Sequence, residues 1–289
     1  IRRDFTINSI YADIDGNIFD PNNGVEDLQN GTVKFIGNSY ERIQEDYLRI
    51  LRYIRFFLLY SKKDHSNEIK KTIKQNISGV ANLSKERLLD ELNKIFKSRA
   101  LFKLVKDNFS YEIISLIFPQ LINLKILKKL EKKKEEILIN KSFDFLLALL
   151  ILDETDNADY FLYKFNLSND AQNKIKFLKS NFENLKEKDF FSKKNLEKIF
   201  YYNNKSSVID LIDFELIKTN TKKNKLIELK NYFENKEKPV FPIKAKSIME
   251  KFNLKEGREL GQKLKNLENI WVNNSFSISD KDIENTFSN

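Results

Sequence analysis

Six charged side chains between residues 42 and 55 have types and spacing that suit the binding of an anion. On a helix, with about 100° of rotation per residue, one side of this stretch collects Arg42, Glu45, Asp46, Arg49, Arg52 and Arg55. The simplest interpretation is a solvated face with pairs such as Glu45 with Arg49, each contributing roughly 0.2–0.5 kcal/mol. Arginine usage elsewhere in the chain argues for a more specific role.

Arginine is rare in this sequence. The chain has 51 lysine and arginine residues, and only nine of them are arginine, six of which lie in the first 55 residues. A merely solvated face could have used lysine, as the rest of the chain does. The guanidinium group presents a rigid planar fork of donors that suits phosphates and base edges. We therefore interpret this face as a surface that binds an anionic ligand.

The other side of the same stretch predicts the element that positions these charges. Seven apolar or aromatic side chains fall within an arc of roughly 120° and form a core-facing stripe. They are Ile43, Tyr47, Ile50, Leu51, Ile54, Phe57 and Leu58. We therefore expect one helix over residues 41–60, with Asp46 and Arg49 one turn apart on the same face.

The first 37 residues differ from the rest of the chain. Residues 9–13 and 17–19 flank an Asp15-Gly16 turn signal and predict a short hairpin. A helical turn over residues 25–29 and a strand over 32–36 are expected next. From residue 39 onward the apolar periodicity is helical and the loops are short, and the charged, proline-containing run 235–242 is the best boundary candidate.

Composition restricts the class of protein. The formal net charge of +9 and pI near 9.3 favour a polyanionic partner. The chain has no cysteine, so disulfides and thiolate metal sites are impossible and a reducing, cytoplasmic setting fits. No apolar run approaches the roughly 20 residues of a membrane span. The single histidine, His65, lies in a polar loop and is expected to be exposed to solvent.

Four stretches occur in an order that resembles a known family. The resemblance is to the class II tRNA nucleotidyltransferases, which comprise CCA-adding enzymes and bacterial poly(A) polymerases within the polymerase-beta-like superfamily. It is specific over residues 1–96, looser over the helical middle and faint at 241–271. The motifs that carry it are Arg2–Asn8 (RRDFTIN), Asp20–Leu28, Glu45–Arg49 (EDYLR) and Leu83–Leu92.

The resemblance implies a mainly α fold with helical neck, body and tail domains, preceded by a small β remnant of a polymerase-beta-like nucleotidyltransferase head. The implied boundaries follow the motifs. The head remnant covers residues 1–37, the neck with a nucleotide-recognition helix covers 38–98, the RNA-binding body covers 99–238 and the tail covers 239–289.

The resemblance also implies roles for individual residues. Asp46 and Arg49 match residues that select the incoming base, where a carboxylate accepts from the amino group shared by C and A while the guanidinium donates to a ring acceptor. Asp4 matches a ribose contact, and Glu45 is expected to orient the arginines. The other matches to nucleotide-contacting positions are Arg3, Arg52 and Arg55, the last two suited either to the triphosphate or to holding neighbouring carboxylates.

Asp27 and Arg87 are interpreted as structural. The implied function is the addition of C, C and A from CTP and ATP to the 3′ end of tRNA, with Mg2+ and without DNA or a membrane as partner. The family's metal-binding DxD pair and phosphate loop precede the first motif, and no such stretch precedes that motif in this sequence. We therefore expect an N-terminally truncated chain with no catalytic or metal-binding residue, inactive by itself.

Two alternatives stay open at this point. The first is a poly(A) polymerase or an enzyme restricted to adding only CC or only A. The second is a non-catalytic helical RNA-binding module, which would bind tRNA without any nucleotide preference.

Overall fold

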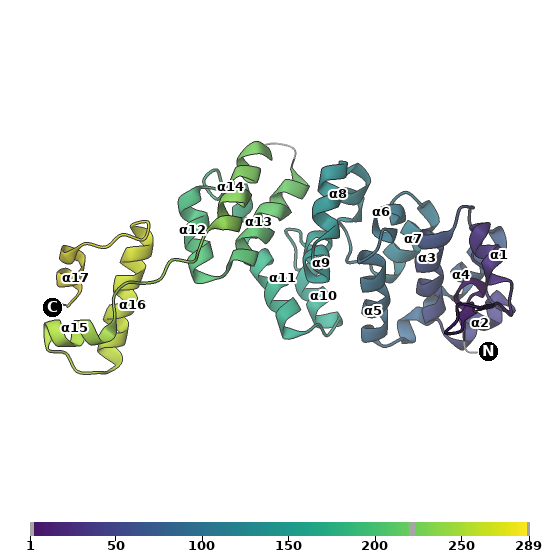
Figure 1. The fold of residues 1–289 in the computed structure, drawn as a ribbon, viewed down its shortest axis with the longest axis horizontal. Coiled ribbons are helices and arrows are strands. Elements are labelled where there is room, and N and C mark those ends of the chain that lie inside the picture. Colours follow the sequence, from purple (N-terminus) through teal and green to yellow (C-terminus); the bar gives the residue numbers. More distant parts are fainter. Residues whose placement is uncertain (1–2, 220–222, 288–289) are drawn as a thin grey trace. The chain divides into compact units, whose positions relative to one another are not determined.

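The computed structural model describes residues 3–219 and 223–287. It is mainly helical, with one small two-stranded sheet in the described residues, so the predicted fold class is confirmed. The chain divides into two compact units, Ile1–Lys179 and Ser180–Asn289, and Figure 1 labels their elements. Arg2, in the first motif, lies outside the described residues.

The N-terminal segment contains the predicted hairpin. Strands β1 (Tyr11–Ala12) and β2 (Ile18–Phe19) pair antiparallel, and helix α1 (Gly24–Gln29) follows. Gly24 is required here, because a Cβ at this position would lie 2.2 Å from the carbonyl oxygen of Thr6. This close approach brings the second motif against the short 3-10 helix η1 (Thr6–Asn8).

The strand expected over residues 32–36 is reduced to a single bridge between Phe5 and Phe35. Two backbone hydrogen bonds support it: Thr6 N–H donates to Lys34 at 3.1 Å, and Ile36 N–H donates to Asp4 at 3.0 Å. These bonds fix the backbone on both sides of Asp4.

The single helix expected over residues 41–60 is wrong. The structure has two helices, α2 (Ser39–Glu45) and α3 (Leu48–Tyr60), with Asp46 in an extended conformation between them. The Asp46 side chain accepts a hydrogen bond from Leu48 N–H at 3.1 Å, a local alternative to continuing the helix. Tyr47 packs so closely on Gly79 that a Cβ there would lie 2.3 Å from its ring. Two contacts therefore fix the break between α2 and α3: the hydrogen bond from Leu48 to Asp46 and the packing of Tyr47 on Gly79.

The rest of the first unit consists of short helices with many buried apolar side chains. Helix α3 packs against α5, α6 and α7, and α9 has seven buried residues in its nine positions. The elements are α4 (Asn67–Asn76), η2 (Ile77–Asn82), α5 (Lys85–Phe96), α6 (Ala100–Leu104), α7 (Asn108–Ile117), η3 (Leu124–Lys129), α8 (Lys132–Ile139), α9 (Phe143–Ile151), α10 (Asn157–Lys164) and α11 (Asn169–Phe182), which runs across the unit boundary.

The prediction that His65 is exposed is also wrong. Its side chain is buried, with Nδ1 3.0 Å from the Tyr53 hydroxyl and Nε2 3.0 Å from Asp107. Burial would raise the pKa of Asp107, but hydrogen bonds from His65 and Ser110 outweigh it and lower this pKa to about 2. The partners come from distant parts of the chain, so the polar sequence around His65 did not reveal them.

The regular elements in the described residues of the second unit are all helices. Its last three helices enclose a separate apolar cluster built around Ile248, Leu260 and Leu267. Across residues 3–219 and 223–287, each helix is too short or too polar to cross a lipid bilayer. The elements are η4 (Asn184–Lys186), α12 (Lys193–Tyr202), α13 (Lys205–Lys218), α14 (Lys223–Asn235), α15 (Ala245–Phe252), α16 (Arg258–Asn273) and α17 (Asp280–Phe287).

Candidate functional site

Asp4 of the first motif is the centre of the candidate site. Its carboxylate is buried, and each oxygen accepts from a different guanidinium of α3. Arg49 Nε lies 2.9 Å from Oδ1, and Arg52 Nε pairs with Oδ2. Two cations on one buried carboxylate offset the cost of removing its charge from water. The first and third motifs are thus joined by an ion pair that fixes both.

Glu91 on α5 is a second buried carboxylate in the same network. Only 1% of its side chain is exposed, and it binds Arg55 Nε at 2.8 Å and Lys94 Nζ at 2.9 Å. Arg52 Nη1 is 3.8 Å from Oε1, the Glu91 oxygen that also binds Lys94. Arg52 therefore lies between the carboxylates of Asp4 and Glu91.

Glu45, at the end of α2, extends the network towards solvent. It pairs with Arg42 and, at 2.6 Å, with Arg49 Nη1. The hydrogen bond from Arg49 and the charge of Arg42 hold the pKa of Glu45 below its ordinary value. These contacts fit the expectation that Glu45 orients the arginines. We call the set Asp4, Arg42, Glu45, Arg49, Arg52, Arg55 and Glu91 the arginine cluster.

Asp46 is beside this cluster rather than inside it. Its Oδ2 accepts from Arg87 Nη2 at 2.7 Å, while its Oδ1 accepts from Leu48 N–H, at the first residue of α3. The side chain is 30% exposed, compared with 13% for Arg49. Asp46 and Arg49 therefore do not share one helical face, because Arg49 turns towards Asp4 and Asp46 turns towards α5.

Arg3 lies at the margin of the cluster. Its guanidinium is 5.8 Å from the ring centre of Tyr11 on the hairpin. Its carbonyl oxygen accepts from Arg42 Nη2 at 2.8 Å. The structure thus links Arg3 to the cluster through its backbone.

The structure brings together five sequence-predicted residues: Asp4, Glu45, Arg49, Arg52 and Arg55. The sequence interpretation had assigned no role to Glu91, although it belongs to the fourth motif. A signal was present, since Glu91 falls within the buried stripe of α5 beside Leu88, Leu92 and Ile95, where a charge needs a partner. Arg87 had been interpreted as structural, and the structure shows that it holds Asp46.

The chemistry of the cluster suits anion binding better than metal binding. Its four guanidinium groups exceed its three carboxylates, and Arg52 keeps 30% of its side chain exposed. Guanidinium donors left unused by the carboxylates can bind phosphate oxygens. In the described parts of the chain no three His, Cys, Asp or Glu side chains form a possible metal site. Asp4 and Glu91 are occupied by arginines, so they do not fit Mg2+.

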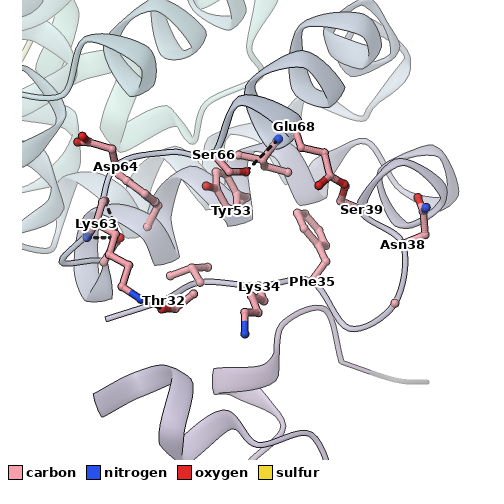
Figure 2. A pocket seen from close by; sticks show the side chains of 15 residues that line it. Thr32, Lys34, Phe35, Asn38, Ser39, Tyr53, Lys63, Asp64, Ser66 and Glu68 are labelled. Carbon is pink, nitrogen blue, oxygen red and sulfur yellow. Dashed lines mark hydrogen bonds between the residues drawn. The ribbon is translucent and has the colours of Figure 1, made fainter. Parts of the chain in front are cut away.

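A cavity of about 430 Å³ lies on another side of α3. Figure 2 shows its lining, with Thr32, Lys34 and Phe35 of the extended segment facing Tyr53, Ser66 and Glu68. None of the predicted nucleotide-contacting residues lines it. This hollow is therefore separate from the arginine cluster.

Comparisons with known proteins agree on one group of enzymes. Residues 1–34 match the model of the poly A polymerase head domain, and residues 66–124 match a probable RNA and SrmB-binding site of polymerase A. The mouse protein named mitochondrial CCA tRNA nucleotidyltransferase 1 is 29% identical over 287 residues, which cover 98% of this chain. The chain spans 64% of that relative's length.

Two solved structures have a similar fold. The Bacillus stearothermophilus CCA-adding enzyme in complex with CTP has a TM-score of 0.63 and 19% identity, over 95% of this chain and 69% of that one. The Thermotoga maritima CCA-adding enzyme complexed with tRNA has a TM-score of 0.61 and 17% identity, over 99% and 72%. At this level of sequence identity, the structural similarity supports a shared fold.

Proposed function

We propose, from the premise that this chain belongs to the class II CCA-adding enzyme family, that its protein adds C, C and A to the 3′ end of tRNA. CTP, ATP and tRNA are the proposed substrates. The observation that carries the proposal is the arginine cluster, in which residues from three of the four family motifs form one buried network beside Asp46. Such a network can hold guanidinium donors in fixed directions.

Base selection is assigned to Asp46 and Arg49. Arg87 and Leu48 N–H each hold one oxygen of Asp46, so the direction of the remaining lone pairs is set before a nucleotide arrives. An ionised carboxylate has about four acceptor sites, which leaves two for an exocyclic amino group. Uracil and guanine present a carbonyl where C and A present that amino group, so either one places an acceptor oxygen against the Asp46 carboxylate and forms no hydrogen bond with it.

Arg3, Arg52 and Arg55 are assigned to the nucleotide as well. Arg52 and Arg55 are anchored by Asp4 and Glu91 and would face the triphosphate with their free N–H groups. Asp4 uses two acceptor sites for Arg49 and Arg52. The other two remain available for a ribose hydroxyl, in keeping with a preference for ribonucleotides.

Mg2+ is assigned to the carboxylates of the family's DxD motif, which is not found before the first motif of this sequence. When bound, the metal would neutralise charge on the triphosphate. We accordingly expect the 289-residue chain to be inactive by itself. A cytoplasmic location also stays a prediction, and mitochondria are an open alternative given the mouse relative's name.

A purely RNA-binding role is the second candidate. It is supported by the match of residues 66–124 to a probable RNA-binding site. Poly(A) synthesis and addition of only CC or only A are variants of the first candidate. Supplying the triphosphates singly and combined, as described next, separates these variants.

The test uses the full-length protein, tRNA lacking CCA and each of the four ribonucleoside triphosphates, singly and combined. Asp46→Ala is expected to reduce the preference for C and A over U and G by about 10- to 100-fold, since an unpaired polar group at a selective site costs a few kcal/mol. Glu86→Ala, an exposed carboxylate on α5, is the matched control. Loss of tRNA binding with base selection intact would instead favour the RNA-binding module.

A further inference from the structure

A second site lies in the first unit, in an apolar groove with two lysines. The groove has a volume of about 390 Å³ and lies between η2, the start of α5, the end of α7 and the end of α10. Lys85 and Lys164 line it together with apolar side chains. The apolar lining includes Val80, Leu88, Leu116, Ile117 and Phe165.

The two lysines leave positive charge uncompensated in this groove. Both are half-buried, and within the described residues neither forms an ion pair. Lys85 Nζ is 3.5 Å from the Ala81 carbonyl, and Lys164 Nζ is 5.4 Å from the ring centre of Phe165. Burial, and then the charge of Lys85, lower the pKa of Lys164. Two cations that disfavour each other are stabilised when an anion lies between them.

The apolar lining restricts what that anion can be. Leu116 is 58% exposed beside the buried Leu88 and Phe165, so the groove offers apolar surface next to its charges. A sugar or a base attached to a phosphate matches this combination. Helix α10 also exposes the rings of Tyr160 and Tyr163, and exposed aromatics are surfaces on which RNA bases stack.

We propose that this groove holds a phosphodiester of the RNA substrate between Lys85 and Lys164, with the attached ribose or base against the apolar lining. The inference rests on the proposed function, because it takes tRNA as the partner. It adds an RNA contact that lies outside the arginine cluster. An acidic segment of a protein partner is the other occupant that the charges would admit, and the experiment separates the two.

The experiment measures binding of full-length protein to tRNA lacking CCA by fluorescence anisotropy, between 50 and 300 mM salt, a range on the order of that used for salt slopes. Each of Lys85→Ala and Lys164→Ala is expected to weaken binding about fivefold. The double variant is expected to reduce the slope of log K against log salt by about 0.7–0.9, the value for one phosphate. Lys103→Ala with Lys106→Ala, two exposed lysines outside the groove, is the control for lost charge.

A third substitution separates the apolar contact from the charges. Leu116→Ser is expected to weaken tRNA binding about two- to threefold without changing the salt slope, because it removes no phosphate contact. Leu116 is exposed, so a polar side chain there leaves the fold intact, and circular dichroism melting checks this for each variant.

The outcomes are distinct. A double Lys85→Ala, Lys164→Ala variant with the affinity and slope of the control pair overturns the groove proposal and leaves the groove to a protein partner. The same result would leave the proposed function standing if tRNA still binds and base selection is normal. Failure of the unsubstituted protein to bind tRNA would overturn the proposed function itself.

Discussion

The arginine cluster of the first unit and the helix pair α13–α14 of the second unit both bury carboxylates, but with different cations. In the cluster, Arg52 lies between Asp4 and Glu91 and contacts both. In the pair, the fully buried Asp213 binds Lys230, whose Nζ lies 2.8 Å and 3.1 Å from its two oxygens. In this helix pair the ammonium of Lys230 serves one carboxylate, whereas the planar guanidinium of Arg52 lies within ion-pair distance of two. An ammonium such as that of Lys94 can also reach two carboxylates, but it lacks the fixed plane of donors.

This difference explains why arginine is concentrated where a ligand is expected. A lysine on Asp213 only has to compensate a buried charge, and this chain uses lysine for that purpose. Under the proposed function, the arginines of α3 bind carboxylates on one edge and keep donors for a nucleotide on another. Lysine cannot divide its donors in this directed way, since its ammonium is a compact point charge.

The largest expected effect comes from removing Glu91. Glu91→Ala leaves Arg55, Lys94 and part of Arg52 without their buried partner, and we expect the free energy of unfolding to fall by about 3–5 kcal/mol. Asp90→Ala is a matched control, because Asp90 also binds Lys94 but its side chain is 61% exposed. That control is expected to cost less than about 1 kcal/mol. Urea denaturation followed by circular dichroism measures both, and equal losses would contradict the comparison.

Exchanging the cations tests the comparison more directly. Arg52→Lys is expected to lose the directed hydrogen bond to Asp4 or the longer ion pair with Glu91. We expect the free energy of unfolding to fall by up to about 1.5–3 kcal/mol, the value of a hydrogen bond to a charged group. Lys230→Arg keeps the pair with Asp213 and is expected to change stability by less than about 1 kcal/mol. Trp271, the single tryptophan, reports on the second unit by fluorescence. If Arg52→Lys leaves the free energy of unfolding unchanged, the planar guanidinium group is not needed at this position.

Local pattern was sufficient for the hairpin, for most helices and for the buried stripe at Ile43, Ile50 and Ile54. It failed where a distant partner decides the local structure. The break at Asp46 depends on a cap to Leu48 and on the contact of Tyr47 with Gly79, and the burial of His65 depends on Asp107, 42 residues away. The motifs identified Asp4 and the arginines, but their ion pairs with one another and with Glu91 came only from the fold.

The smallest expected effect on stability concerns Arg87, where stability and function should separate. The pair of Arg87 with Asp46 is 47% and 30% exposed, so Arg87→Ala is expected to cost less than about 1 kcal/mol in unfolding free energy. Asp46 would keep its bond to Leu48 N–H but lose the contact that orients its other oxygen. Under the proposed function, KM for CTP and ATP should therefore rise severalfold while the Kd for tRNA stays unchanged. Arg87→Lys should recover part of this effect, because an ammonium can still reach one oxygen. If KM is unchanged in Arg87→Ala, then Asp46 needs no help from α5, and the capping bond alone fixes the residue that reads the base.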